Sequence, residues 1–185
     1  MTFPRRLAAI TTALVAATTV SVVAAGGLGG PAEVSSTAWR VDPPPYLRVS
    51  PDERAARELV EVVNQVRVAA GVEPVAWNSQ IAQAARTHAA YMQSTGVTAH
   101  EGPPGVTASQ RLDAVGFVWT TWGETIGSGF VEPQPLVDAW MKSATHRRSL
   151  IDPLFEHVGA GVTASPDGTP FWSLLLVATA PVPIP

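Results

Sequence analysis

The sequence contains no cysteine, and this absence removes several classes of site at once. No disulfide, thiolate metal ligand, cysteine nucleophile or lipid-modified cysteine can form. Cysteine usage therefore also gives no indication of the redox compartment in which the protein works.

Positive charge is scarce as well. Lysine occurs once, as Lys142, among twelve basic residues, and the formal net charge is -3. Charged residues make up 15% of the chain, against about 25% in a typical globular protein. No basic patch, long charge run or internal repeat appears, so we expect no nucleic-acid partner. The length of 185 residues favours one domain with appendages.

Residues 1–25 have the pattern of a signal peptide. Arg5 and Arg6 precede an uncharged run that ends at Ala25, where small residues suit a signal peptidase. The run also approaches the length of a membrane-spanning helix, roughly 18 residues or more, so an uncleaved N-terminal anchor is the alternative. We therefore expect a secreted, extracellular protein. Contact with the membrane is expected only through an uncleaved N-terminal segment, which would leave the domain anchored and extracytoplasmic.

The remaining chain divides into a linker, a domain and a tail. Residues 26–49 are rich in Gly, Pro and Ser and include a "DPPP" run, which predicts a linker. We expect the folded domain over residues 50–180 and a short tail over 181–185.

Helical patterns dominate the first part of the domain. Ser50 and Glu53 have the spacing of a capping box, and Gly71 supplies the stop of this first helix. Comparable signals predict three further helices, at residues 79–95, at 108–115 and from Pro133 or Pro135 onward. The stretch "HRRSLIDP" after the last of these is expected to be a broken turn.

Strand patterns become stronger toward the C-terminus. The segment "FVWTTW" at 117–122 alternates bulky and small residues, which predicts a strand followed by a glycine-rich turn. Residues 155–164 and 169–179 are expected to pair as a hairpin around Asp167 and Gly168. An antiparallel hairpin covered by helices indicates an α+β fold rather than a doubly wound parallel sheet.

The histidines separate into two groups. His88 falls on the buried stripe of the second helix and His157 within a strand pattern, so we interpret both as structural. His100 and His146 stand where regular structure breaks, and Glu124 is expected at the end of a strand. No contiguous metal motif joins these three residues, so the residues alone leave open a common site or separate solvated loops.

Five landmarks in order resemble the CAP superfamily of cysteine-rich secretory, antigen 5 and pathogenesis-related proteins. The resemblance is to its cysteine-free bacterial branch of SCP domains and spans residues 53–178. It implies an α+β fold, a three-layer α-β-α sandwich of the CAP type with a mainly antiparallel central sheet and a wide cleft. The landmarks are Asn64 with Arg67 and Gly71; Pro74 with Trp77; His100; Gly123 with Glu124; and Trp140 with Ser143, His146, Arg147 and Gly159.

The resemblance also implies a site in that cleft. His100 matches the family's first histidine, Glu124 its central glutamate and His146 its second histidine. Ser143 stands in place of a second glutamate, and Thr125 replaces the asparagine that usually follows the central glutamate. We therefore expect Ser143 and Thr125 to line the cleft.

The chemistry of this set allows two interpretations. Two imidazoles and a carboxylate suit a divalent metal, zinc above all, and three protein ligands leave one coordination position open. The same residues could form a metal-free polar cluster that stiffens the cleft. Glu124 would then favour protonation of a nearby histidine and make a pH-responsive pair.

Three functions remain open at this point. The first is a secreted or surface-tethered cleft-binding module, whose partner is an unknown envelope ligand or protein. The alternative is a metal-dependent, peptidase-like hydrolase of the cell envelope, with Glu124 or a metal-bound water as general base. The loss of the second carboxylate counts against the hydrolase. The third is a structural or immunomodulatory surface protein with a vestigial cleft.

Overall fold

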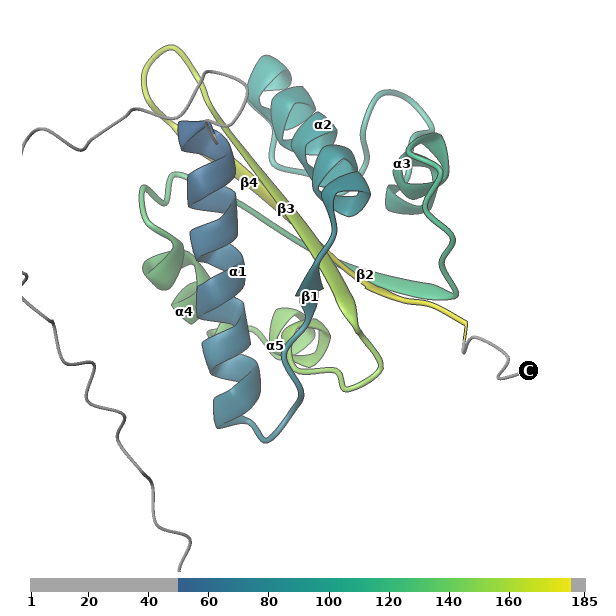
Figure 1. The fold of residues 1–185 in the computed structure, drawn as a ribbon. Helices are drawn as coiled ribbons and strands as arrows, with labels where there is room; N and C mark the ends of the chain where they lie inside the picture. Colours follow the sequence, from purple (N-terminus) through teal and green to yellow (C-terminus); the bar gives the residue numbers. More distant parts are fainter. Residues whose placement is uncertain (1–49, 181–185) are drawn as a thin grey trace, which may run out of the picture. The chain divides into compact units, whose positions relative to one another are not determined.

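The computed structural model describes residues 50–180 (Figure 1). The predicted signal peptide at 1–25, linker at 26–49 and tail at 181–185 lie outside the described residues. Within the described part, every helix is too short or too polar to span a lipid bilayer.

Helices come first along the domain and the two longest strands come last. The helices are α1 (Pro51–Ala69), α2 (Ser79–Thr95), α3 (Ala108–Ala114), α4 (Pro133–Lys142) and α5 (Ala144–Leu150). The strands are β1 (Ala76–Trp77), β2 (Thr121–Ser128), β3 (His157–Ala164) and β4 (Pro170–Ala178).

The strands form one mixed sheet in the order β1-β3-β4-β2. The hairpin of β3 and β4 is antiparallel, as predicted, and β2 adds to β4 in antiparallel orientation. Only the short β1 is parallel to its neighbour, β3. The predicted α+β class and mainly antiparallel sheet are therefore confirmed, with β2 at one free edge.

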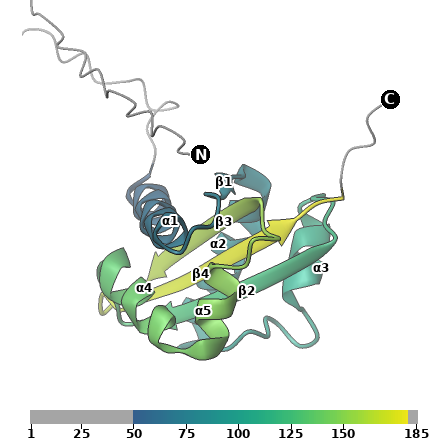
Figure 2. The same ribbon diagram turned by 90° about the horizontal axis from the view of Figure 1, so that it is seen from below.

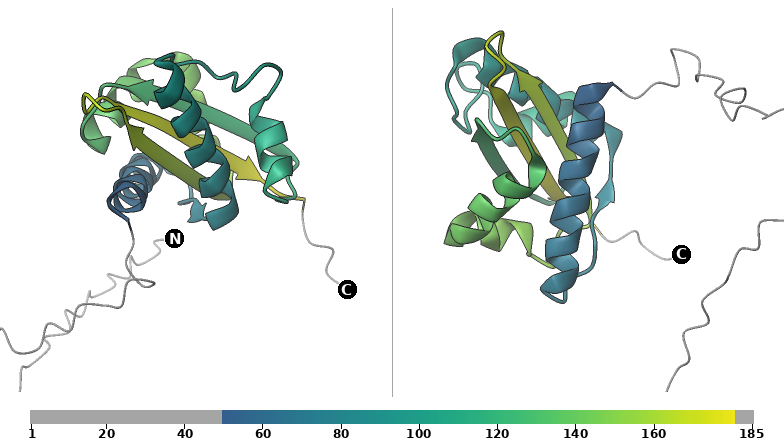
Figure 3. Two further views of the ribbon diagram at one scale, coloured as in Figure 1. Left: turned by 90° about the horizontal axis from the view of Figure 1, so that it is seen from above. Right: turned by 90° about the vertical axis from the view of Figure 1, so that its left-hand side faces the viewer.

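Helices cover both faces of the sheet (Figures 2 and 3). Leu174 and Leu176 of β4 pack in a core shared with α1 and α4, whereas Leu175 and Val177 pack in a second core with α2 and α3. Because side chains alternate along a strand, β4 is buried on both faces. This arrangement confirms the three-layer α-β-α sandwich.

Two glycines of β3 allow α2 to lie directly on the sheet. A Cβ atom at Gly159 would overlap the backbone at Ala82, and one at Gly161 would overlap the backbone at Arg86. This close approach fixes α2, and with it the buried His88, against the central strands.

The capping box predicted for the first helix forms only in part. The Ser50 hydroxyl accepts a hydrogen bond from the Glu53 amide at 3.1 Å. The Glu53 carboxylate does not return to Ser50, because it accepts two hydrogen bonds from Arg57 at 3.0 and 2.8 Å. A complete capping box occurs instead at α3, between Thr107 and Gln110.

The strand predicted at 117–122 lies further along the chain. The strand β2 contains the segment predicted as a glycine-rich turn, so Glu124 lies within a strand and not at its end. Its glycines serve packing, since a side chain at Gly127 would collide with Leu136 of α4. Glycine marks a close approach here, and the sequence pattern was misread as a loop.

Candidate functional site

Glu124 is the centre of a buried polar cluster. Its side chain is only 1% exposed. One carboxylate oxygen, Oε1, accepts hydrogen bonds from Arg111 Nη2 at 2.6 Å and from Ser173 Oγ at 3.3 Å. The other, Oε2, lies 2.9 Å from Nδ1 of His100. Both oxygens of this carboxylate are therefore already engaged by protein groups.

Arg111 connects this carboxylate to the loop that carries His100. The arginine belongs to α3 and is 5% exposed. Its guanidinium also donates to the backbone carbonyls of His100 and Val106 at 3.4 Å. Sequence reasoning missed Arg111, although its position between Ala108 and Leu112 on the buried side of a predicted helix was an available signal.

The charges in this cluster depend on one another. Burial alone would raise the pKa of Glu124, but the hydrogen bond from His100 and the positive charge of Arg111 outweigh burial and lower that pKa. The same hydrogen bond raises the pKa of His100, against the effects of burial and of the Arg111 charge. Glu124 is therefore a carboxylate near neutral pH, and His100 presents its Nδ1 to that carboxylate.

The second histidine, His146, lies on the other side of β2, the strand at the free edge of the sheet. His146 lies in the first turn of α5, a helix where the sequence predicted a broken turn, and α5 packs beside β2 (Figure 2). Burial and then the charge of His100 lower the pKa of His146. The structure thus brings His100 into contact with Glu124 and places His146 within electrostatic range of His100. Among residues 50–180, no three His, Cys, Asp or Glu side chains converge as a metal-ion site.

Thr125 and Ser143, the two other residues predicted to line the cleft, lie apart from the contact between His100 and Glu124. Thr125 is fully buried, and its hydroxyl has no hydrogen-bond partner within the described part of the chain. Strand alternation turns Thr125 away from the face of Glu124 and toward α4 and α5. Ser143 is half-buried at the junction of α4 and α5, three residues before His146, and makes no side-chain capping bond.

His88 is a core residue, as the sequence predicted. Its side chain is buried, and Nε2 lies 2.9 Å from the carbonyl oxygen of Ala99. This contact holds the residue before His100 against α2. The loop that presents His100 is thereby fixed at two points, by His88 and by Arg111.

The fold and the site together define a CAP-type domain with a histidine–glutamate pair at the open edge of its sheet. A family model described as the cysteine-rich secretory protein family, CAP, matches residues 60–176, which is more than half of the chain. The chain belongs to this family. The sequence-based resemblance is thus confirmed, including the cysteine-free character of this member.

Two proteins of Bacillus subtilis are related in sequence. The uncharacterized protein YkwD is 28% identical over 59% of this chain and 42% of its own length. The uncharacterized membrane protein YlbC is 24% identical over 76% of this chain and 38% of its own length. The chain therefore spans less than half of either relative.

Solved structures share the fold at low sequence identity. An extracellular SCP-domain protein of Bacillus anthracis is 20% identical, with a TM-score of 0.63, over 71% of this chain and 45% of that one. An outer surface protein of Borrelia burgdorferi is 18% identical, with a TM-score of 0.62, over 67% of this chain and 92% of that one. A cysteine-rich secretory protein of Staphylococcus aureus is 24% identical, with a TM-score of 0.59, over 71% and 40%.

Proposed function

We propose that this protein is an extracytoplasmic binding module whose ligand site is the histidine pair at the free edge of β2. The observation that carries the proposal is the way His100 is held. Its Nδ1 lies 2.9 Å from a carboxylate that is 1% exposed, whereas the His100 side chain itself is 56% exposed. A buried group thus orients an accessible imidazole, which is the arrangement expected where a ring nitrogen must meet a ligand.

The contacts of Glu124 change the role proposed for it at a metal. Because Arg111, Ser173 and His100 already engage both carboxylate oxygens, Glu124 suits the outer position, where it accepts the Nδ1 hydrogen of His100. Nε2 of His100 and the imidazole of His146 are then the two protein nitrogens available to a divalent metal such as zinc. A bound ion would supply an electrophilic anchor for an oxygen atom of the envelope ligand or protein partner.

The acid–base properties of the histidines support this assignment. The lowered pKa of His146 keeps its imidazole neutral near pH 7, the form that binds metals. The raised pKa of His100 makes a proton compete with the ion in mildly acidic solution. We therefore propose that metal affinity falls as the pH falls below neutrality.

The hydrolase alternative receives less support from these contacts. A general base needs a pKa near the working pH, and the pKa of Glu124 is lowered. Its oxygens are also occupied and shielded from solvent. Any catalysis would therefore have to use a group other than Glu124.

An extracellular location is part of the same proposal. It is supported by the predicted signal peptide and by the described origins of the B. anthracis and B. burgdorferi structural neighbours, which are an extracellular and an outer surface protein. Cleavage of the signal peptide would release the domain, and its retention would tether it to the membrane.

Metal titration followed by thermal unfolding tests the site. We expect zinc to raise the melting temperature of the wild-type protein, and His100→Ala and His146→Ala to abolish that rise. Glu124→Gln should weaken zinc affinity by about 10–100-fold without abolishing binding, because the residue acts through His100. His157→Ala, a histidine of β3, is the matched control and should retain the full response. An identical response to zinc in the wild type, His100→Ala and His146→Ala would overturn the proposal.

A further inference from the structure

The outer edge of β2 carries backbone groups that point away from the rest of the sheet. Just past β2, the Gly129 N–H donates to the Pro170 carbonyl at 2.9 Å, and these two residues continue the register of β2 with β4. Backbone groups alternate in direction along an antiparallel strand, so every second residue counted back from Gly129 pairs with β4. The residues between them direct their N–H and C=O groups outward, and these are Trp122, Glu124, Ile126 and Ser128.

Among residues 50–180, one of these outward groups has a hydrogen-bond partner. The carbonyl of Ile126 accepts a hydrogen bond from Nε1 of Trp140 at 2.9 Å, which confirms its outward direction. The Glu124 side chain is 1% exposed but the whole residue is 8% exposed, so its accessible surface lies mostly on the backbone. Solvent therefore reaches the strand edge beside the buried carboxylate. An accessible edge with unpaired groups is a template for another extended chain.

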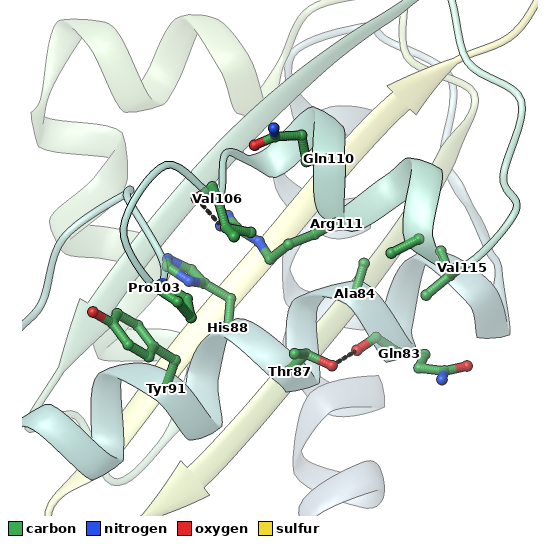
Figure 4. Close-up of a pocket in the computed structure, with 11 residues that line it drawn as sticks. Gln83, Ala84, Thr87, His88, Tyr91, Pro103, Val106, Gln110, Arg111 and Val115 are labelled. Carbon is green, nitrogen blue, oxygen red and sulfur yellow. Dashed lines mark hydrogen bonds between the residues drawn. The ribbon is translucent and has the colours of Figure 1, made fainter.

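The loop of His100 flanks this edge on the α2/α3 face of the sheet. His100 contacts the carboxylate at the middle of β2, and Thr98 Oγ1 donates to Ser128 Oγ at 2.8 Å. Arg111 and His88 reach the same loop from α3 and α2 (Figure 4), and each contacts a backbone carbonyl of the loop. This flank is therefore held in place before any partner binds.

The junction of α4 and α5 flanks the edge on the opposite face. Trp140 of α4 reaches the Ile126 carbonyl, and Cβ of Ser149 in α5 lies 3.5 Å from the position that a Cβ atom would take at Gly123. The chain between these two contacts carries three basic side chains that form no salt bridge within residues 50–180, namely Lys142, Arg147 and Arg148. In a chain whose net charge is -3, this positive segment favours an acidic partner.

We propose that the free edge of β2 binds an extended segment of a partner protein, which adds to the sheet as a further strand. Side chains of such a segment alternate between the two faces of the sheet. On one face they meet Trp122, which is 36% exposed and shares that face with Glu124, so apolar side chains fit there. On the other face they meet the basic α4–α5 junction, so acidic side chains fit there. This inference rests on the proposed function, because it names the partner of the same edge as a protein.

A second copy of this chain fits the edge less well. The two-fold axis of an antiparallel strand pair stands perpendicular to the sheet, so the same helices of both copies would meet on each face. The basic α4–α5 junctions would then face each other without carboxylates, and like charges disfavour such a contact. A glycan is also a poorer fit, because it has no backbone of alternating N–H and C=O groups to continue the sheet.

A series of peptides tests strand addition on the whole protein. The parent probe has seven residues that alternate valine and glutamate and is capped at both ends. Methylation of every valine amide, or of every glutamate amide, removes the hydrogen-bond donors along one edge of the peptide only. We expect one methylated peptide to bind like the parent and the other to bind at least about tenfold more weakly. The valine set should be the sensitive one in an antiparallel arrangement and the glutamate set in a parallel one. Calorimetry in EDTA measures binding, and no difference between the two methylated peptides would overturn the proposal.

Variants of the protein separate the contributions of the two faces and of the backbone. Trp122→Ala removes the apolar contact, and Trp122→Pro also removes an outward N–H, so binding should fall in the first variant and further in the second. Lys142→Glu combined with Arg148→Glu should reverse the charge preference, so that a probe with lysine in place of glutamate binds better than the parent. Arg54→Glu, on the exposed side of α1, is the matched control and should leave the preference unchanged.

Two other results would overturn the proposal. The first is binding of an N-acetylglucosamine oligomer without binding of any peptide, and the second is a dimer of the protein that Trp122→Pro dissociates and that excludes the peptide. Because the peptides are measured in EDTA, failure of the zinc response leaves this test intact. Loss of peptide binding with a normal zinc response would remove strand addition and leave the proposed metal site.

Discussion

Two buried arginines in this domain are held in opposite ways. Arg67 of α1 is fully buried, and its guanidinium donates only to backbone carbonyls. Those carbonyls belong to Glu73, Leu150, Asp152 and Phe155. Arg111 of α3 instead contacts the Glu124 carboxylate at 2.6 Å, and its Nε has no hydrogen-bond partner among residues 50–180. All three guanidinium nitrogens of Arg67 thus donate to backbone oxygens, whereas the Arg111 guanidinium also neutralises a carboxylate.

The difference between the contacts of Arg67 and Arg111 indicates different roles for the two arginines. The Arg67 contacts tie α1 to the end of α5 and the segment that leads to β3, through the carbonyls of Leu150, Asp152 and Phe155. The Arg111 contacts balance the charge of a buried carboxylate that orients an exposed imidazole. Arg67 therefore has a structural role, and Arg111 acts on the candidate site through Glu124.

Loss of the Arg67 contacts should have the largest effect. Arg67→Met removes the four hydrogen bonds of a buried guanidinium to backbone carbonyls, so we expect the free energy of unfolding to fall by roughly 3–5 kcal/mol. Urea denaturation measures the change. Arg54→Met, on the exposed side of the same helix, is the control and should change stability by no more than about 0.5 kcal/mol. Similar losses in both variants would refute the structural role of Arg67.

The Arg111 pair should give a smaller loss that a second substitution relieves. Arg111→Met strands the buried Glu124 carboxylate, and we expect a loss of roughly 2–4 kcal/mol at neutral pH. In the double variant with Glu124→Gln, much of that loss should be recovered, because the uncompensated charge is gone. A double-mutant cycle by urea denaturation should therefore give a coupling energy of about 1–3 kcal/mol. Simple additivity would show that the pair does not interact.

The smallest expected effect is the pH dependence of the stability that His100 and Glu124 contribute. The raised pKa of His100 stabilises the fold fully below its ordinary value of 6.5, and this contribution is lost as the pH rises through the raised pKa. The lowered pKa of Glu124 stabilises the fold above its ordinary value of 4.5, and this is lost as the pH falls through the lowered pKa. The pair therefore contributes most between these two values.

Comparison of wild type with His100→Gln isolates this contribution. The stability difference should be greatest near pH 5.5–6 and fade toward alkaline pH. Because the His100 side chain is 56% exposed, it should stay below about 1 kcal/mol. Thermal unfolding from pH 5 to pH 9 measures it, and a difference that grows with pH would contradict the assigned contact.

Parts of the site could be predicted from sequence, and other parts could not. His100, Glu124 and His146 were found through their resemblance to a family pattern, and the contact of His100 with Glu124 is present. The place of Arg111 on the buried side of α3 could have been predicted from the helical spacing, but its partner Glu124 lies in another element and could not. The strand character of β2 was missed because the packing need at Gly127 comes from Leu136, which belongs to another element.

The sequence by itself determined the helices other than α5, the final hairpin, the absence of disulfides and the family, because these depend on local spacing and on residue identity. Only the tertiary structure decided the state of Glu124, since its partners Arg111, His100 and Ser173 are 13, 24 and 49 residues away in the chain. Hydrogen bonds reach only about 3 Å, so the fold must first bring such distant side chains together. For the same reason, the contact of His88 with the Ala99 carbonyl could not be predicted from either residue alone.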